Sequence, residues 1–177
     1  MDRTLPAIIT GLVVIALFAL MWRSWRARKR RDSGLDAGYP APATDSAPLV
    51  SVSCLYVATT PRDRPLERLA IPGLGFRARA DIAVTDAGVW LSPRGETPVY
   101  IPAEAITLLG PATVAIDRVV EKDGLLRLGW HLVGSATPVN SYFRITDVGD
   151  RRRLTAAIRS LSAATITSTT PDHESEA

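Results

Sequence analysis

Residue types that carry out catalysis or bind metals are scarce in this chain. It contains one cysteine, Cys54, and two histidines, of which His131 falls in the region expected to fold. Cys54 lies in an apolar, strand-like run without a neighbouring histidine, so we interpret it as a small buried side chain rather than a nucleophile. His131 is expected at the solvent edge of a strand. These two residues cannot form a structural zinc site, and we predict a protein that is not an enzyme and has no metal site or cofactor.

A glycine-rich stretch, Gly73-Leu-Gly75-Phe-Arg-Ala78, has the spacing of a dinucleotide-binding loop. Such a loop follows a strand and opens a helix, because the helix N-terminus holds the pyrophosphate. Here the stretch follows Pro72 and leads into a strand-like pattern instead. We therefore predict no nucleotide site.

A group of arginines is the one cluster in the sequence that could bind a ligand. Its members are Arg62, Arg64, Arg68, Arg77 and Arg79. Guanidinium groups bind phosphate through paired hydrogen bonds, so this cluster could contact the headgroups of anionic lipids. Asp63 and Glu67 lie within the cluster and oppose this interpretation. Lipid binding is therefore an alternative hypothesis, and a protein partner is the leading one.

The charge distribution argues against a nucleic-acid partner. The 177 residues have a net charge of +3, but residues 1–31 carry +6 and the remainder −3. A nucleic-acid-binding domain carries its basic patch on the folded part, and that part is acidic here. The single cysteine precludes an internal disulfide, which is compatible with a reducing compartment.

The region between residues 49 and 164 has the alternation of a β-rich domain. In residues 76–85 the side chains expected to face the core are Phe76, Ala78, Ala80, Ile82 and Val84. Polar residues between them are expected to face solvent, as in a half-buried antiparallel strand. Asp86-Ala87-Gly88 then predicts a hairpin turn in which Gly88 has a positive φ.

Other segments have similar strand-like patterns: residues 50–59, 89–91, 98–101, 105–109, 113–116, 125–133 and 139–145. Pro102 is expected to end a strand because it cannot donate to a ladder, and residues 121–124 are expected to form a turn. About seven short strands predict an antiparallel sandwich or barrel.

One helix is predicted at residues 147–164. Asp147 is the expected N-cap, and Asp150 lies in the first turn. Leu154, Ile158 and Leu161, with Ala157, form a narrow apolar stripe that we expect to close the open end of the barrel. The arginines of this helix, Arg151, Arg152, Arg153 and Arg159, are expected mostly in solvent.

Residues 5–22 form an uncharged apolar run. At 1.5 Å per residue the run is about 27 Å long, roughly the thickness of the hydrocarbon core of a bilayer. Residues 1–4 carry no net charge, and no small-residue cleavage step follows the run, in contrast to a signal peptide. We predict a retained transmembrane helix.

A basic and aromatic flank follows the run. The residues expected at the membrane interface are Trp22, Arg23, Trp25, Arg26, Arg28, Lys29, Arg30 and Arg31. Positive charge marks the cytoplasmic side of a span, so we predict an external N-terminus and a cytoplasmic domain. The expected organisation is an anchor and its flank (residues 1–31), a Pro/Ala-rich linker (32–48), a domain (49–164) and a disordered acidic tail (165–177).

Seven antiparallel strands followed by one helix resemble the pleckstrin-homology (PH) superfold. The segments 84–91 (VTDAGVWL) and 101–106 (IPAEAI) are similar to the turn–glycine–strand and isoleucine–proline patterns of bacterial PH-like domains. The whole chain resembles a family of small actinobacterial single-pass membrane proteins, often labelled as transport or export proteins. Only two of its 21 basic residues are lysines, a bias typical of high-GC bacteria.

The sequence thus predicts a membrane-tethered, non-catalytic interaction or scaffolding module on the cytoplasmic face of a bacterial plasma membrane. The alternative is binding of anionic lipid through the five arginines. A more distant alternative is an accessory subunit of a transport or export complex, because one apolar span without polar residues offers no solute path by itself.

Overall fold

The computed structural model describes residues 4–32, 34–43, 46–112, 114–115, 118–119, 124–134 and 137–167. The chain divides into two compact units, residues 1–34 and 35–177, which are described separately. Residues 121–123 of the predicted turn and residues 168–177 of the predicted tail lie outside the described residues.

The first unit is built on one helix, α1 (Thr4–Asp32). Residues 7–27 of α1 form a stretch long and apolar enough to cross a membrane, and none of this stretch is buried within the protein. Large apolar side chains such as Ile15, Phe18 and Leu20 are more than half exposed. A helix stretch that is apolar on all sides is suited to lipid rather than to water.

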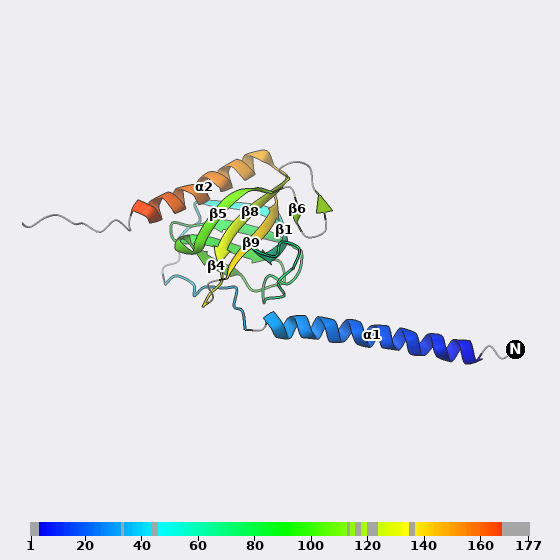
Figure 1. Ribbon diagram of the computed structural model, residues 1–177. Coiled ribbons are helices and arrows are strands. Elements are labelled where there is room, and N and C mark those ends of the chain that lie inside the picture. Colours follow the sequence, from blue (N-terminus) through cyan, green and yellow to red (C-terminus); the bar gives the residue numbers. More distant parts are fainter. Residues whose placement is uncertain are drawn as a thin grey trace, which may run out of the picture. The chain divides into compact units, whose positions relative to one another are not determined.

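The second unit is a seven-stranded antiparallel sheet with strand order β4-β3-β2-β1-β9-β8-β5 (Figure 1). The strands are β1 (Val50–Pro61), β2 (Ala78–Val84), β3 (Gly88–Pro93), β4 (Val99–Pro102), β5 (Ile106–Ala112), β8 (Leu125–His131) and β9 (Pro138–Arg144). A short 3₁₀ helix, η1 (Ala103–Ala105), joins β4 to β5, and β6 (Val114–Ala115) pairs only with β7 (Arg118–Val119). The predicted fold class of seven antiparallel strands followed by a helix is confirmed.

Gly88 corrects one expectation about the β2–β3 hairpin. The glycines with positive φ among the described residues are Gly73, Gly95 and Gly134, so Gly88 does not have the predicted left-handed backbone. A Cβ atom at Gly88 would instead lie 2.4 Å from the carbonyl oxygen of Ile101 on the neighbouring strand. Glycine is needed at this position because β3 and β4 approach each other closely.

Helix α2 (Val148–Thr167) covers one end of the sheet (Figure 1). The Asp147 carboxylate accepts a 2.7 Å hydrogen bond from the Asp150 N–H group, which confirms the predicted N-cap. Leu154, Ile158 and Leu161 are buried in the core, as the stripe predicts. Arg151 differs from its expectation: it is half-buried and donates a hydrogen bond to the Leu125 carbonyl, because it lies beside the start of β8.

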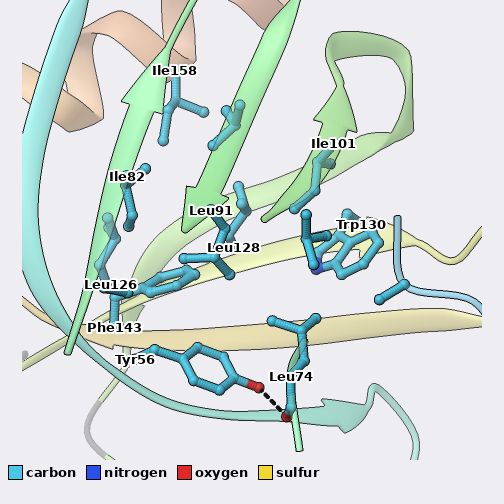
Figure 2. Close-up of a cluster of buried hydrophobic side chains, with 14 of the residues drawn as sticks. Tyr56, Leu74, Ile82, Leu91, Ile101, Leu126, Leu128, Trp130, Phe143 and Ile158 are labelled. Atoms are coloured by element: carbon cyan, nitrogen blue, oxygen red, sulfur yellow. Dashed lines mark hydrogen bonds between the residues drawn. The ribbon is translucent and has the colours of Figure 1, made fainter. Parts of the chain in front are cut away.

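The core extends from α2 to the loop that follows β1. Figure 2 shows Ile158 of α2 at one end of the cluster and Leu74 of the loop at the other, with Trp130 and Phe143 between them. Fully buried side chains from β1, β2, β3, β4, β8 and β9 complete the cluster. Helix α2 and the β1–β2 loop (residues 62–77) thus cover the two ends of the sheet's apolar interior.

The β1–β2 loop, residues 62–77, folds back toward β1. Its Leu69 N–H group donates to the Thr59 carbonyl at 3.0 Å, and Leu69, Ile71 and Leu74 are buried. Phe76 was expected to face the core but is 62% exposed. It precedes β2, so the alternation of the strand has not yet begun at this residue.

A segment that precedes β1 also packs on the domain. We call residues 35–40 the strap. Asp36 forms an isolated antiparallel bridge with Val133, and Ala37 is only 1% exposed. Leu35 and Tyr39 pack against the main core. The first part of the expected linker is therefore docked on the sheet, and residues 33 and 34 alone stand between it and the end of α1 in the sequence.

Candidate functional site

A groove of about 530 Å³ lies where the strap meets β4. Its walls come from the strap, the β2–β3 turn, β4 and η1. The lining residues are Tyr39, Pro40, Asp86, Ala87, Tyr100, Pro102, Ala103 and Glu104. All of them belong to the second unit, and residues 61 positions apart in sequence, Tyr39 and Tyr100, form its aromatic part.

Tyr39 is held in the groove by two hydrogen bonds to different strands. Its backbone N–H group donates to the Tyr100 carbonyl at 3.1 Å, which satisfies one acceptor on the edge strand β4. Its hydroxyl donates to the His131 carbonyl at the end of β8 at 3.0 Å. The strap thus links the β4 edge to β8, which lies next to the opposite edge of the sheet.

Tyr100 and the β2–β3 turn form the facing wall. The Tyr100 hydroxyl donates to the Ala87 carbonyl at 2.9 Å, and the same carbonyl accepts the Ala103 N–H group at 3.1 Å. The Trp90 ring stacks on the Tyr100 ring at a tilt of 42°, with 5.0 Å between centroids. These contacts fix the Tyr100 ring, the turn and the start of η1 relative to one another.

The groove carries negative charge. Asp86 and Glu104 are exposed, and within the described part of the chain neither carboxylate forms an ion pair or a hydrogen bond. Burial, together with the Glu104 carboxylate, raises the pKa of Tyr39. The pKa of Tyr100 is also raised, by burial first and then by Glu104 and Asp86. Both phenols therefore stay neutral at physiological pH beside two unpaired carboxylates.

Three of the five arginines predicted as a lipid site have partners inside the domain. The Arg62 guanidinium donates to the Thr107 hydroxyl on β5. Arg64 forms ion pairs with Glu67 at 2.7 Å and with Asp63 at 3.5 Å. Arg68 donates to the Val57 carbonyl at 2.6 Å. These three guanidinium groups share no acceptor with one another.

Arg77 and Arg79, the remaining members of the cluster, have exposed side chains. Arg77 precedes β2, whereas Arg79 lies within β2 opposite Leu55 of β1. The Arg79 carbonyl accepts the Arg94 N–H group at 2.8 Å, which pairs β2 with the end of β3. Within the described part of the chain, the guanidinium groups of Arg77 and Arg79 are therefore not hydrogen-bonded or ion-paired. The other three arginines of the cluster are.

Cys54 and His131 occupy structural positions. Burial, reinforced by Asp81, raises the pKa of the Cys54 thiol from its ordinary value of 9.0 to about 12. A thiol with such a pKa is a poor nucleophile at neutral pH. His131 is half-buried, and its carbonyl is the acceptor for Tyr39. In the portion of the chain that the structure describes, no three side chains of the metal-binding types lie together.

The predicted interface residues lie on the C-terminal part of α1. Trp22 and Trp25 are exposed, and the Arg26 guanidinium lies 5.6 Å from the centroid of the Trp22 ring. Arg23 and Arg30 are also exposed on this helix. Arg28, Lys29 and Arg31 lie within α1, and nothing is described of their side chains.

The architecture and sequence agree with one family. The family described as "Bacterial PH domain-like" matches residues 20–159, which include the strap, the sheet and most of α2. The chain belongs to the bacterial PH domain-like family. This confirms the resemblance to bacterial PH-like domains, while the actinobacterial origin stays a prediction.

Two solved structures are similar to this chain at low sequence identity. A chain of the 8S snRNP assembly intermediate is 7% identical, with a TM-score of 0.48, over 79% of this PH-like protein and 97% of that chain. The C-terminal phosphotyrosine interaction domain of mouse APBB2 is 12% identical, with a TM-score of 0.47, over 78% and 99% of the two chains. No curated protein matches the chain.

Sequence reasoning did not find the groove. Tyr39 and Pro40 fall in a stretch rich in proline and glycine that has no apolar periodicity, and such a stretch is typical of a linker. A signal was nevertheless present, because Leu35, Ala37 and Tyr39 alternate like the inward residues of a strand. The two carboxylates, Asp86 and Glu104, are 18 positions apart and have no local pattern that joins them.

Proposed function

We propose that this protein is a single-pass membrane protein whose PH-like domain is a non-catalytic interaction module on the cytoplasmic face of a bacterial plasma membrane. The observation that carries the proposal is that a bacterial PH-like domain follows a helix long and apolar enough to span a bilayer. The basic residues after this apolar stretch support a cytoplasmic domain, because cytoplasmic flanks carry the excess of Lys and Arg. Residues 33 and 34 alone separate α1 from the strap in the sequence, so the connection between the anchor and the domain is short.

A protein partner is favoured over an anionic lipid surface. Arg62, Arg64 and Arg68 each already donate to an intramolecular partner, so fewer of their N–H groups are left to bind phosphate in paired hydrogen bonds. The groove at Tyr39 and Tyr100, by contrast, presents unpaired carboxylates and aromatic side chains. Its charge would repel anionic headgroups and attract a basic partner.

A role as a transporter in its own right is not supported by α1. Among its side chains described between residues 7 and 22, Thr10 is the only polar one. A solute path needs polar groups that face a bundle or a cavity, and one apolar helix does not provide them. Any part in transport or export would be that of an accessory subunit.

Membrane anchoring and orientation are tested on the intact chain. We expect the protein to stay in the membrane fraction after alkaline carbonate extraction. A fluorescent protein fused after Ala177 should be active inside the cell, and alkaline phosphatase fused at the same position should be inactive. Release into the soluble fraction would refute the anchor, and active phosphatase would refute the orientation.

The choice between a protein and a lipid is tested with the same protein in nanodiscs. The variant with Arg77→Gln and Arg79→Gln removes the two arginines of the cluster with exposed, unpaired guanidinium groups. If the partner is a protein, anionic vesicles should bind no more of the wild-type protein than of this variant. Proximity labelling in cells should identify the same protein partner in replicate experiments. Salt-sensitive binding of vesicles that is lost in the double variant would favour the lipid alternative.

A further inference from the structure

The groove between the strap and β4 contains two carboxylates that do not help to hold the strap or the β2–β3 turn in place. The strap is held by main-chain and tyrosine contacts, and the β2–β3 turn is held by the Ala87 carbonyl. Asp86 and Glu104 take no part in these contacts. Two carboxylates without an ion pair or hydrogen bond at one groove, beside contacts that do not need them, point to a ligand outside the domain.

The negative charge of the groove is uncompensated. No lysine or arginine is among its lining residues. Glu104 lines the groove from η1, and Asp86 lines it from the β2–β3 turn. A ligand that enters between these carboxylates meets a negative potential from two sides.

A metal ion does not suit this groove. Calcium and magnesium take six or more oxygen ligands, from several carboxylates and carbonyls. The groove offers two carboxylates, and the described residues contain no group of three acidic, histidine or cysteine side chains. Its aromatic and proline walls favour an organic cation, which gains both from the carboxylates and from contact with aromatic rings.

Both aromatic rings are preorganised. Tyr39 is held by its backbone bond to Tyr100 and by its hydroxyl bond to His131, and Tyr100 is held by Ala87 and by the Trp90 ring. A ligand therefore does not have to order these side chains when it binds, and the entropic cost of binding is smaller.

We propose that this groove binds an arginine or lysine side chain on an exposed segment of a partner protein. The assignment of the occupant rests on charge complementarity: two unpaired carboxylates and two fixed tyrosines fit a guanidinium or ammonium group. The proposal rests on the proposed function as a protein-interaction module and names the chemistry that its partner presents. Because Tyr39 and Pro40 belong to the strap, the groove is complete only while the strap is docked.

The test uses the full-length protein in nanodiscs of uncharged phosphatidylcholine. It compares three short peptides that have the same sequence except at two positions, where each peptide contains a different residue. One peptide contains arginine, one lysine, and one citrulline, which has the shape of arginine without its charge. Fluorescence anisotropy should show binding of the arginine and lysine peptides, and binding of the citrulline peptide should be at least about tenfold weaker. Raising the salt concentration from about 0.05 M to about 0.3 M should weaken the binding of both charged peptides.

Matched variants locate the binding. Asp86→Asn and Glu104→Gln keep the shape of each side chain, and each should weaken binding of the arginine peptide by about fivefold. Glu96→Gln removes an exposed carboxylate that does not line the groove and should leave the affinity unchanged. Near-ultraviolet circular dichroism checks that each variant is folded.

Three results would overturn the proposal. These are an arginine peptide that binds the double variant Asp86→Asn/Glu104→Gln as tightly as the wild type, a citrulline peptide that binds equally well, and no binding of either charged peptide to the wild type. Spermidine that binds more tightly than the peptides would show a small amine as the occupant and refute a protein segment. If the double variant loses the peptides but keeps the proximity-labelled partner, this groove is not the partner site while the proposed function stands.

Discussion

The backbone N–H group of Tyr39 donates a hydrogen bond to the carbonyl of Tyr100 at 3.1 Å, so a residue that precedes the first strand pairs with the edge strand β4. Exposed edge strands present unpaired backbone groups and invite unwanted pairing. The strap covers part of this edge and at the same time forms one wall of the groove. Stability of the domain and formation of the groove therefore depend on the same contact.

Removal of the strap should destabilise the domain. A chain of residues 35–167 should fold, whereas a chain of residues 49–167 should lose about 3 kcal/mol of unfolding free energy, because it lacks the Tyr39 hydrogen bonds and the buried Ala37. Urea unfolding followed by tryptophan fluorescence measures the difference. Tyr39→Phe, which removes only the hydroxyl bond, should cost about 1 kcal/mol. Equal stability of the two chains would show that the strap is not part of the domain.

Gly88→Ala should be strongly destabilising. The added methyl group would lie 2.4 Å from the Ile101 carbonyl and 2.9 Å from the Pro102 Cα atom, and neither backbone can move without parting β3 from β4. We expect a loss of about 3 kcal/mol, the upper range for overpacking. Gly110→Ala is the matched control, because nothing lies within 4 Å of its added methyl group, and it should change stability by less than about 0.5 kcal/mol.

A buried hydrogen-bond chain crosses the core, and Thr59→Val should break it. The Tyr56 hydroxyl donates to the Leu74 carbonyl at 2.8 Å and lies 2.9 Å from the Thr59 hydroxyl (Figure 2 shows the Tyr56–Leu74 bond). A carbonyl can only accept and Tyr56 has one hydroxyl hydrogen, so Thr59 donates to Tyr56. It then accepts from Ser141, at 2.7 Å, and Ser141 accepts the Trp130 indole N–H at 3.0 Å.

Thr59 thus joins two hydrogen-bonded pairs, Tyr56 with Leu74 and Ser141 with Trp130. Thr59→Val should cost about 2 kcal/mol, because the buried Tyr56 oxygen loses the donor of its second hydrogen bond and the buried Ser141 hydroxyl hydrogen loses its acceptor. Ser160→Ala removes a hydroxyl on the exposed face of α2 and should have little effect on the urea midpoint. A Thr59→Val midpoint equal to the wild type would contradict the assigned direction and the coupling of the chain.

Cys54 makes stability depend on alkaline pH. Burial raises the pKa of its thiol to about 12 in the folded protein, above the ordinary 9.0 that we expect when the chain is unfolded. The stabilisation is therefore complete below pH 9 and is lost as the pH rises from 9 toward 12. Cys54→Ala should reduce the fall in unfolding free energy between pH 8 and pH 11. In the native protein at pH 8 the thiol should react with iodoacetamide much more slowly than in urea; equal rates would refute its burial.

Arg68 should contribute to stability, and Arg77 should not. Arg68→Met keeps most of the apolar stem but loses the 2.6 Å bond to the Val57 carbonyl, so we expect a loss of about 1.5 kcal/mol. Arg77→Met removes an exposed guanidinium and should stay within about 0.5 kcal/mol of the wild type. Similar effects of the two variants would show that the Arg68 contact contributes nothing.

The local patterns of the sequence were enough to predict the strands, the helix and their order. Alternation in residues 125–133 and 139–145 and the 3.6-residue stripe at Leu154, Ile158 and Leu161 are properties of neighbouring residues, so they predict β8, β9 and α2. The apolar run and its basic flank predict α1 in the same way. The predicted strand at residues 76–85 began too early, because Phe76 lies in the loop before β2 and is exposed.

Contacts between distant residues were not predictable in this way. The role of Gly88 depends on how closely Ile101 approaches it from the next strand, and the partners of Arg62 and Arg68 depend on where β5 and β1 lie beneath the loop. A propensity for a positive φ or for a solvated guanidinium is a local average, and the packed neighbour overrides it.

The chain's periodicity and apolar run alone predicted a β-rich domain with one closing helix and a separate apolar helix, because these signals act over a few residues. The groove arose from folding: Tyr39, Asp86 and the neighbouring pair Tyr100 and Glu104 lie in three separate parts of the sequence and meet because the strap crosses from β8 to β4. Nothing in the neighbourhood of each residue encodes that meeting. It follows from the order of strands in the sheet, which places the β4 edge and the end of β8 within the reach of one short segment.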